Sequence, residues 1–334
     1  LKNKIYYMSV WRVKPVSAFE ADMKKNDLKR VLTKWGLTSL GIGAIIGGGI
    51  FTLTGIAAHD YAGPALALAF VIAGIGCLFA SLCYAEFASV LPVEGSAYAY
   101  AYGTVGELFA WFIGWNLILE YRMGATTVAV AWSGYFVKLL HLFGIEFPIW
   151  LCNDMATATE KSLAANLAAP SFAFNLPAFL ITWVVTAILV KGIKEAAKTN
   201  NIIVIIKIAV VLFVIIVGAF YVKTENWVPF IPDEIPALDE LGNATGKMNF
   251  GFGGVLTAAT IVFFAYIGFD AVSTQAGEAI NPKKDVPFAI VASLIICTVL
   301  YILVSLVLTG MVKYTELDRA APVASAFSGI GINW

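Results

Sequence analysis

Seven apolar runs constrain what this chain can fold into more than any other feature. They lie at residues 36–58, 64–91, 106–140, 176–190, 199–222, 251–280 and 286–312, and charges, proline or glycine bound each of them. About 20 apolar residues are enough for a helix to cross a bilayer. The 334 residues are 60% hydrophobic and only 13% charged, whereas soluble domains are about 25% charged. We therefore expect an all-α integral membrane protein.

The charge balance and the scarcity of cysteine and histidine exclude several other classes. The 22 basic and 22 acidic side chains cancel, so the chain lacks the basic excess of a nucleic-acid-binding protein. The four cysteines and two histidines have no metal-ligand spacing, and we predict neither a metal site nor a cofactor. No nucleophile, base and orienting group occur together, so we do not expect an enzyme.

The distribution of lysine and arginine predicts how the chain is oriented. If the spans alternate, the segments on the N-terminal side carry more than twice as many of these residues as the opposite segments. Such an excess marks the cytoplasmic side of a membrane protein. We expect a multi-pass protein of the cell membrane (plasma or inner), with a cytoplasmic N-terminus and the acidic loop 223–250 outside.

Three consecutive glycines stand near the middle of the first span, within Gly41–Phe51. Glycine costs about 1 kcal/mol relative to alanine inside a helix, so the helix is expected to unwind at Gly47–Gly49. Unwound backbone at membrane depth is tolerated where it lines a cavity or is buried in protein. A new half-helix starting near Gly48 points the positive end of its dipole at that cavity and favours a carboxylate. Close packing of helices through small residues is the alternative, and the glycines alone do not decide.

The sixth span repeats this device, because Gly268 is followed two positions later by the carboxylate of Asp270. A pair of interrupted helices at corresponding positions of two halves points to the binding site of a transporter. Freed carbonyl groups suit an ammonium ion and freed amides suit a carboxylate, which are the two ends of an amino acid. The predicted substrate-binding residues are Ile45, Gly47, Gly48, Gly49, Phe264, Ile267 and Gly268.

Within this set we expect the carbonyl groups of Ile45, Phe264 and Ile267 to receive the ammonium group. The amides of Gly48 and Gly49 are expected to receive the carboxylate. The side chain of Phe264 stands beside the second break, where it can act as a lid over the ligand.

Lys207 lies in the fifth span with no other charge within several residues on either side. A lysine among apolar side chains can bind and release a proton in the physiological range. We therefore predict that Lys207 couples transport to protons. Snorkelling of its ammonium group to the cytoplasmic headgroups is the alternative.

Three further charged residues lie at membrane depth and need an explanation. Glu120 is predicted to line the substrate cavity, with a protonated structural carboxyl as the alternative. Asp270 is expected either to bind substrate or to cap the loosened backbone, and the sequence does not rank these roles. For Arg122 we expect packing between helices.

Several ordered motifs resemble those of a known family. Gly41–Phe51, Tyr84–Tyr98 and Gly114–Tyr121 look like the amino acid–polyamine–organocation (APC) superfamily of permeases. The stretch Gly268–Thr274 is similar to the cationic amino acid transporter branch of that superfamily. Glu278, Asn281 and Pro282 extend this second similarity.

The resemblance implies a leucine-transporter (LeuT) type fold of two inverted five-helix repeats, with the substrate between helices one, three, six and eight. It places the substrate contacts on the glycine-interrupted segments and the gate on Phe264. Lys207 matches the fifth-helix lysine that replaces a sodium ion in proton-coupled members. Family members often carry a hydroxyl residue or alanine where this chain has Gly48.

The family also sets expectations about the extent of the chain. Members usually have about 12 or more spans, so we expect seven of them here and read the chain as a fragment that does not transport by itself. The predicted organisation is a cytoplasmic segment 1–35, a first repeat 36–222 and an extracellular loop 223–250. An incomplete second repeat, 251–334, then ends in a segment that resembles an outer cap, Pro322–Phe327.

The predicted function is secondary active transport of amino acids by alternating access, as proton-coupled symport. An exchanger without proton coupling and an amino-acid-sensing membrane receptor are the alternatives. Expected partners are the amino acid substrate, protons, the lipid bilayer and a small accessory membrane subunit. No nucleic-acid partner is expected.

Overall fold

The computed structural model describes residues 11–24, 30–191, 193–238, 244–319 and 321–331. It divides into two compact units. Unit 1 combines Leu1–Ile45, Ile75–Gly124 and Ile267–Cys297, and unit 2 combines Ile46–Gly74, Ala125–Tyr266 and Thr298–Trp334. The chain passes from one unit to the other inside three long helices and inside both predicted helix breaks.

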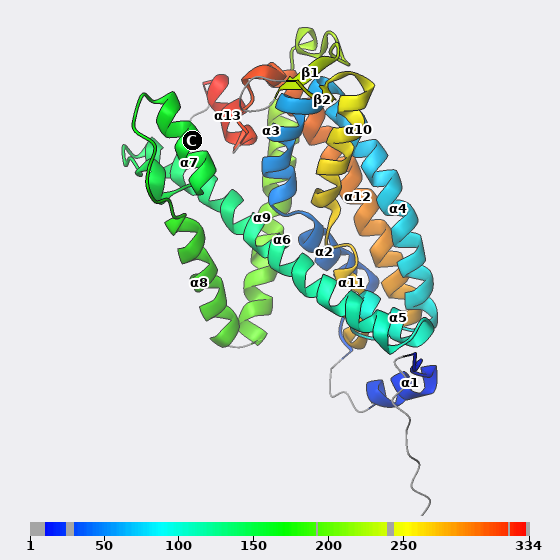
Figure 1. Cartoon of the computed structure of the whole chain (residues 1–334). Helices are drawn as coiled ribbons and strands as arrows, with labels where there is room; N and C mark the ends of the chain where they lie inside the picture. Colours follow the sequence, from blue (N-terminus) through cyan, green and yellow to red (C-terminus); the bar gives the residue numbers. More distant parts are fainter. Residues whose placement is uncertain (1–10, 25–29, 192, 239–243, 320, 332–334) are drawn as a thin grey trace, which may run out of the picture. The chain divides into compact units, whose positions relative to one another are not determined.

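The long helices coincide with the predicted apolar runs (Figure 1). They are α2 (Lys34–Ile45), followed by η1 (Gly49–Leu53), α3 (Thr54–Ala57) and η2 (Ala58–Ala62); α4 (Leu66–Val90); α6 (Glu107–Leu142); α8 (Leu176–Lys191); α9 (Ile193–Ala219); α10 (Gly251–Val262), followed by η6 (Phe263–Tyr266) and α11 (Ala271–Thr274); and α12 (Pro282–Met311). The shorter elements are α1 (Val16–Lys24), η3 (Gly63–Ala65), α5 (Ser96–Thr104), η4 (Ile149–Leu151), α7 (Met155–Ala164), η5 (Thr224–Trp227), β1 (Ile235–Leu238), β2 (Ala244–Asn249), η7 (Ala276–Glu278), η8 (Tyr314–Glu316) and α13 (Pro322–Gly329).

Four stretches of the described residues are long and apolar enough to cross a membrane, namely Gly49–Val90, Ile202–Ala219, Gly251–Thr274 and Pro282–Met311. Leu176–Val190 is a shorter apolar helix. The mostly helical, membrane-spanning class is therefore confirmed, whereas the count of seven spans stays a prediction. α6 has 36 residues, which at 1.5 Å per residue is about 54 Å, longer than the hydrocarbon core.

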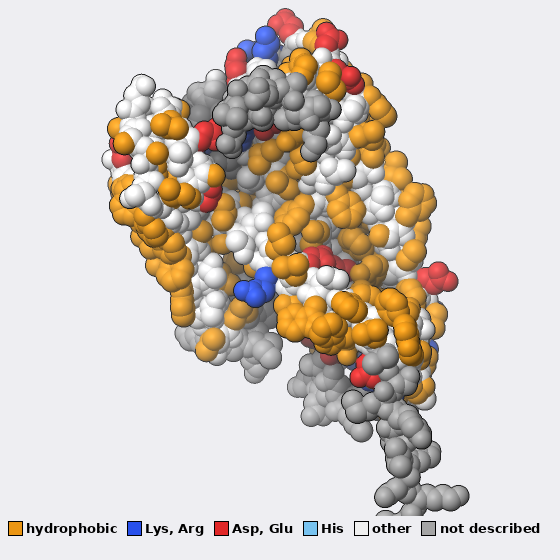
Figure 2. Space-filling model, viewed as in Figure 1, with side chains coloured by type: hydrophobic (Ala, Val, Ile, Leu, Met, Phe, Trp, Pro, Cys, Tyr) orange, Lys and Arg blue, Asp and Glu red, His pale blue; other side chains and the backbone are white. Residues whose placement is uncertain are grey.

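An exposed apolar stripe on α4 shows which side of this helix suits lipid. Leu68, Val71, Ile75, Phe79 and Leu82 are all exposed, and their spacing of three or four residues places them on one face. Figure 2 shows hydrophobic side chains gathered over α4, as they are over α8. Large exposed apolar surface of this kind marks contact with lipid or protein.

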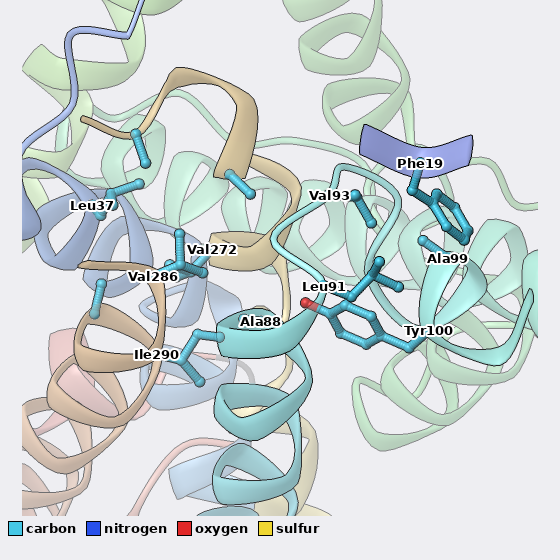
Figure 3. Close-up of a cluster of buried hydrophobic side chains, with 13 residues drawn as sticks. Phe19, Leu37, Ala88, Leu91, Val93, Ala99, Tyr100, Val272, Val286 and Ile290 are labelled. Carbon is cyan, nitrogen blue, oxygen red and sulfur yellow. The ribbon is translucent and has the colours of Figure 1, made fainter. Parts of the chain in front are cut away.

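The core of unit 1 is a cluster of small and aliphatic side chains around two rings, Phe19 and Tyr100 (Figure 3). Leu37 from α2, Val272 from α11 and Ile290 from α12 contribute to it. Close packing of these helices depends on Gly41, because a Cβ there would lie 2.6 Å from Ser293 Oγ and 2.7 Å from Val272 Cγ2. The cluster therefore joins the first half of the first interrupted helix to the second half of the other.

Unit 2 contains the remaining halves of these helices and a small sheet. Strands β1 and β2 pair antiparallel, with Ile235 opposite Asn249, and an irregularity follows Pro236. Helices α8 and α9 pack against each other as a hairpin (Figure 1). α10 packs against η2, where the Phe250 amide donates to the Tyr61 carbonyl over 2.9 Å.

Candidate functional site

The first interrupted helix loses its regular hydrogen bonding at the predicted glycines. α2 ends at Ile45, Ile46 and Gly47 form a bend, and helical structure resumes as the π-helical turn η1 at Gly49. π-helical turns are rare in proteins, and those that do occur are frequently found at functional sites. Gly48 and Gly49 are buried, whereas Gly47 is half-buried.

The second half of this helix meets the sixth-span segment at Gly49, and both lie in unit 2. A Cβ on Gly49 would stand 2.6 Å from both Cα and Cβ of Ala265. A Cβ on Gly48 would stand 3.0 Å from Ala131 Cβ in α6. The glycines thus permit close helix packing as well as a bend, and their part in binding a substrate stays a prediction.

Tyrosine hydroxyl groups hold the backbone on the unit 2 side of the breaks. Tyr301 OH donates to the Ala265 carbonyl over 3.0 Å, and Tyr266 OH donates to the Phe70 carbonyl over 2.9 Å. Tyr135 OH donates to the Phe51 carbonyl in η1. The rings of Tyr266 and Tyr301 are fully buried, so these bonds lie where water cannot compete and an unpaired carbonyl is costly.

The sixth-span segment is interrupted by a 3₁₀ helix followed by a turn. η6 covers Phe263–Tyr266, and α11 begins at Ala271. Between them Gly268 has φ +116°, and a Cβ there would lie 2.7 Å from the Ala44 carbonyl oxygen. In unit 1 as well, therefore, the two interrupted helices meet at a glycine.

Asp270 is buried and its carboxylate accepts two hydrogen bonds within unit 1. Tyr121 OH donates to Oδ2 over 2.9 Å, and Ser96 Oγ donates to the same atom over 3.2 Å. Asp270 stands at the N-cap of α11, but its side chain makes no capping hydrogen bond. Of the two roles that the sequence left open for Asp270, the capping bond to α11 is not formed in this structure, and substrate binding stays a prediction.

Glu120 is half-buried in α6 and lies close enough to Asp270 for the two carboxyl groups to interact electrostatically. Lys207 is half-buried in α9 of unit 2. Phe264 and Ile267 are also half-buried, and Ile45 is 2% exposed. In η1 the hydroxyl Oγ1 of Thr52 is buried and has no partner among the described residues, which leaves it available to a ligand or a water molecule.

The sequence reasoning missed the partners of Asp270 and the tyrosine donors. Ser96 and Tyr121 do lie within two motifs that carry the family resemblance, but they are 174 and 149 positions from Asp270. Only the fold brings them to it. A tyrosine near a helix break is the one sequence signal for such a hydrogen bond. The sequence does not indicate to which backbone carbonyl its hydroxyl group would donate.

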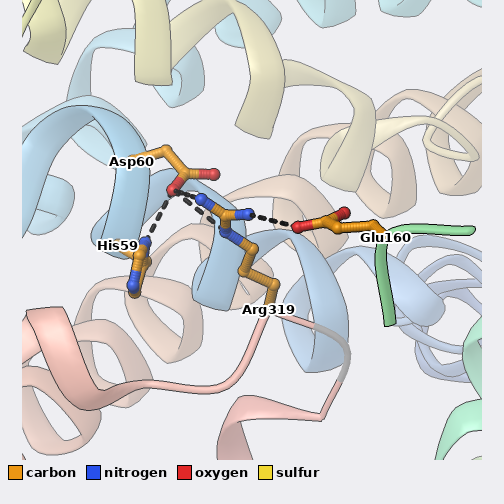
Figure 4. A network of polar contacts seen from close by, with 4 residues as sticks. All are labelled: His59, Asp60, Glu160 and Arg319. Atoms are coloured by element: carbon orange, nitrogen blue, oxygen red, sulfur yellow. Dashed lines mark hydrogen bonds and ion pairs between the residues drawn. The ribbon is translucent and has the colours of Figure 1, made fainter. Parts of the chain in front are cut away.

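A second polar network lies in unit 2, around the segment that leads into α13 (Figure 4). Arg319 donates to Asp60 Oδ1 from Nη2 over 2.6 Å and from Nε over 3.1 Å. His59 Nδ1 lies 2.6 Å from the same oxygen, and Glu160 Oε1 lies 3.9 Å from Arg319 Nη1. Together these contacts join η2, α7 and the approach to α13.

The segment that leads into α13 also contacts α6. Lys138 Nζ lies 3.1 Å from Asp318 Oδ2 and donates to the Ala321 carbonyl over 3.4 Å. Beyond it α13 packs against η1, and Phe327 stacks on Phe213 of α9 with ring centroids 5.6 Å apart. The predicted cap segment is thus the larger part of a short helix seated on the first interrupted helix.

The polar groups near the breaks are of types that bind small polar ligands. Within the described residues no group of three or more His, Cys, Asp or Glu side chains could hold a metal ion. Near the breaks the polar groups are backbone amides and carbonyls, tyrosine and threonine hydroxyls and two carboxyl groups. Within each unit, groups of these types can form hydrogen bonds with a small polar ligand.

Comparison with known proteins gives consistent matches. The amino acid permease family matches residues 32–330. A methylthioribose transporter of Bacillus subtilis is 45% identical over 97% of this chain and 64% of its own length. A branched-chain amino acid permease of the same organism is 46% identical over 98% of this chain and 65% of its own length.

A chloroplastic cationic amino acid transporter of Arabidopsis thaliana is 38% identical over 92% of this chain and half of its own length. The chain thus spans less than two thirds of the length of these relatives. Their names indicate transporters and not enzymes.

Proposed function

Because the chain belongs to the amino acid permease family of the APC superfamily, we propose that it carries amino acids across a membrane by alternating access. The observation that supports this most is the pair of breaks, which bring the two interrupted helices together at Gly49 in unit 2 and at Gly268 in unit 1. Interrupted helices supply backbone groups to a substrate without placing a charged side chain in the membrane.

In this proposal the amides of Gly48 and Gly49, at the start of a new half-helix, bind the substrate carboxylate. The ammonium group is bound by carbonyl groups at Ile45, Phe264 and Ile267. The carbonyl of Ala265, between Phe264 and Ile267, already accepts a hydrogen bond from Tyr301. Gly47 and Gly268 permit the bends, and Phe264 closes over the ligand.

Thr52 is a further candidate contact with the substrate. Its hydroxyl is buried in η1 without a partner among the described residues, three residues after Gly49. An unsatisfied buried hydroxyl costs about 1–3 kcal/mol, which a ligand atom or a bridging water recovers. Thr52→Val keeps the shape, so it is expected to weaken substrate binding without lowering stability.

Asp270 and Glu120 are proposed to form a polar network beside the substrate. Because Tyr121 and Ser96 hold the Asp270 carboxylate, its role is to order this region rather than to leave an open charge. Glu120 is half-buried, so it is the carboxyl of the pair that we assign to a direct or water-mediated substrate contact.

Proton coupling is proposed at Lys207, the half-buried cation of α9. The proposal predicts that Lys207→Ala abolishes the pH dependence of uptake, measured with the protein at its full natural length in proteoliposomes. Lys313→Ala, which removes an exposed lysine beyond the end of α12, is the matched control and keeps the pH dependence. Unchanged pH dependence in Lys207→Ala favours exchange without protons. Binding without counterflow favours a receptor.

The substrate class has a specific second candidate, because a relative of 45% identity is named a methylthioribose transporter. That compound has neither an ammonium group nor a carboxylate. Competition for uptake between a branched-chain amino acid, a cationic amino acid and methylthioribose separates the classes. The amino acid proposal fails if only methylthioribose competes.

We further propose the plasma or inner membrane as the location, with the N-terminus in the cytoplasm, from the excess of Lys and Arg on that side. A two-repeat LeuT-type fold, divided at residues 36–222 and 251–334, and a small accessory membrane subunit also belong to this proposal. Cysteine labelling from either side of intact vesicles tests the orientation.

A further inference from the structure

A cavity of about 680 Å³ opens in unit 1 where two long helices have their ends. Val90 and Leu91 line it at the end of α4, and Lys283 and Lys284 line it in the first turn of α12. Arg30, in the segment before α2, completes the basic side. None of the residues assigned to the substrate, to Lys207 or to the Asp270 network lines this cavity.

Among the described residues, the charged side chains of the lining are all basic. They are Arg30, Lys283 and Lys284, and none of the three forms an ion pair with another described residue. The nearby Asp285 carboxylate accepts the Asn281 amide over 3.3 Å. α12 begins at Pro282, so the positive end of its dipole adds to this field.

The walls of the cavity are held by backbone pairing. Leu32 and Ala279 form an isolated parallel bridge, in which the Val31 and Leu32 amides donate to the Glu278 carbonyl and the Ile280 amide donates to Leu32. This bridge fixes the segment of Arg30 against the start of α12. On the other wall, Leu91 and Val93 belong to the buried cluster of unit 1 (Figure 3).

The cavity also has an apolar side. Val16, Val90 and Ile280 line it and are 45%, 63% and 45% exposed. α4 and α12 lie within two of the stretches that are long enough to cross a membrane, and the end of one and the beginning of the other meet here. The ends of helices that cross a bilayer lie at the level of the lipid headgroups, where basic residues attract anionic lipids.

A basic wall that has no ion pair among the described residues, beside an exposed apolar wall, fits an anionic amphiphile. We infer that this cavity binds the phosphate of an anionic phospholipid through Arg30, Lys283 and Lys284, with the acyl chain along Val90 and Ile280. An acidic protein segment matches the charge but gives no reason for the exposed apolar side chains at membrane level. The inference depends on the membrane location of the chain and not on its substrate.

Lipid binding to the purified protein at its full natural length tests this inference. Native mass spectrometry counts bound lipid during titration with phosphatidylglycerol and, separately, with phosphatidylcholine. The test variant is Lys283→Gln/Lys284→Gln. The matched control is Lys223→Gln/Lys313→Gln, which removes two exposed lysines beyond the ends of α9 and α12.

We expect wild type to prefer phosphatidylglycerol, the test variant to bind it at least tenfold more weakly and the control to change by less than twofold. Arg30→Gln is expected to have an intermediate effect, and substrate binding is expected to persist in all variants with unchanged thermal midpoints. Equal binding of the two lipids, or equal losses in test and control variants, would overturn the inference. Displacement of phosphatidylglycerol by millimolar inorganic phosphate or by an acidic peptide would also contradict a lipid site.

Discussion

The two breaks both interrupt a long helix, but different features of the backbone make each interruption possible. At the first break, between Ile45 and Gly49, consecutive glycines remove side chains, and a neighbouring backbone occupies the space at Gly49. At the second break, a single residue, Gly268, takes a backbone conformation with φ +116° that side chains rarely adopt. A buried carboxylate, Asp270, follows only the second break.

The two breaks therefore differ in why adding a side chain at the glycine costs folding free energy. Around Gly49 the cost of a side chain is steric and depends on the neighbour, Ala265. At Gly268 part of the cost is conformational and stays in the residue itself. The first break can therefore adapt to a changed neighbour, whereas the second break is fixed by its own backbone and by the hydrogen bonds of Asp270.

The largest effect is expected from Gly49→Ala. The added Cβ meets backbone and side-chain carbon of Ala265 at 2.6 Å, and overpacking of this kind costs about 1–3 kcal/mol or more. Gly76→Ala is the matched control, because nothing lies within 4 Å of its added Cβ in α4, and it is expected to stabilise by up to about 1 kcal/mol. The free energy of unfolding in detergent measures both, and equal values would remove the steric account.

Gly268→Ala is expected to cost about 1–3 kcal/mol through backbone strain, to which the close approach of the Ala44 carbonyl oxygen adds. A second substitution that makes room at Gly49 distinguishes this break from the first. Ala265→Gly removes one of the two close atoms at Gly49 and is expected to recover part of the loss in Gly49→Ala. The same change is expected to recover nothing in Gly268→Ala, and recovery there would show that the two breaks share one steric cause.

Asp270→Ala is expected to cost about 1–3 kcal/mol, because the buried hydroxyl of Ser96 is left without its acceptor and Tyr121 loses a hydrogen bond to a charged group. Tyr121→Phe is expected to cost less, since Ser96 still donates. A double-mutant cycle of the two changes should give a coupling energy of at least about 0.5 kcal/mol. Additive losses would mean that the Tyr121 bond does not stabilise the second break.

Arg319→Gln changes a network outside both breaks and is expected to have a smaller effect. Its side chain is 53% exposed, and exposed ion pairs are worth about 0.2–1 kcal/mol. The loss should shrink at high salt, because screening weakens the pair in wild type. Urea titrations at low and high salt check this, and a loss that does not depend on salt would point to packing of the arginine stem instead.

The smallest effect concerns Asp154, the N-cap of α7. Its carboxylate accepts the Thr157 hydroxyl over 2.6 Å and the Thr157 amide over 3.0 Å, and these bonds lower the pKa of Asp154. Because the folded pKa is depressed, the stabilisation is present above the unfolded value of about 3.9 and is lost as pH falls through the folded pKa. Asp154→Asn should remove this pH dependence near α7 in hydrogen exchange, whereas a persistent dependence would assign it to another group.

Much of the fold follows from the sequence, because apolar length and proline placement are local signals. Pro64 lies just before α4 and Pro92 just after it. The position of the first break was also predictable, since three consecutive glycines weaken a helix at the point where they occur. The resemblance to the permease family was carried by whole motifs and is confirmed by the match over residues 32–330.

The partners at the breaks were not predictable. Asp270 was recognised as a buried carboxylate, but its donors come from distant segments. Tyr301 and Tyr135 act through hydroxyl groups whose acceptors depend on how the helices pack. The basic cavity was equally hidden, because Arg30 and Lys283 are brought to one place by the bridge between Leu32 and Ala279.

The central claim is that the freed backbone groups recognise both charged ends of an amino acid. Equilibrium binding of a labelled branched-chain or cationic amino acid to the purified protein tests it most directly, with N-acetylated and methyl-esterified forms of the same compound as competitors. The account predicts that the unmodified amino acid competes and that either modification weakens competition at least tenfold. Equal competition by the modified forms would contradict it.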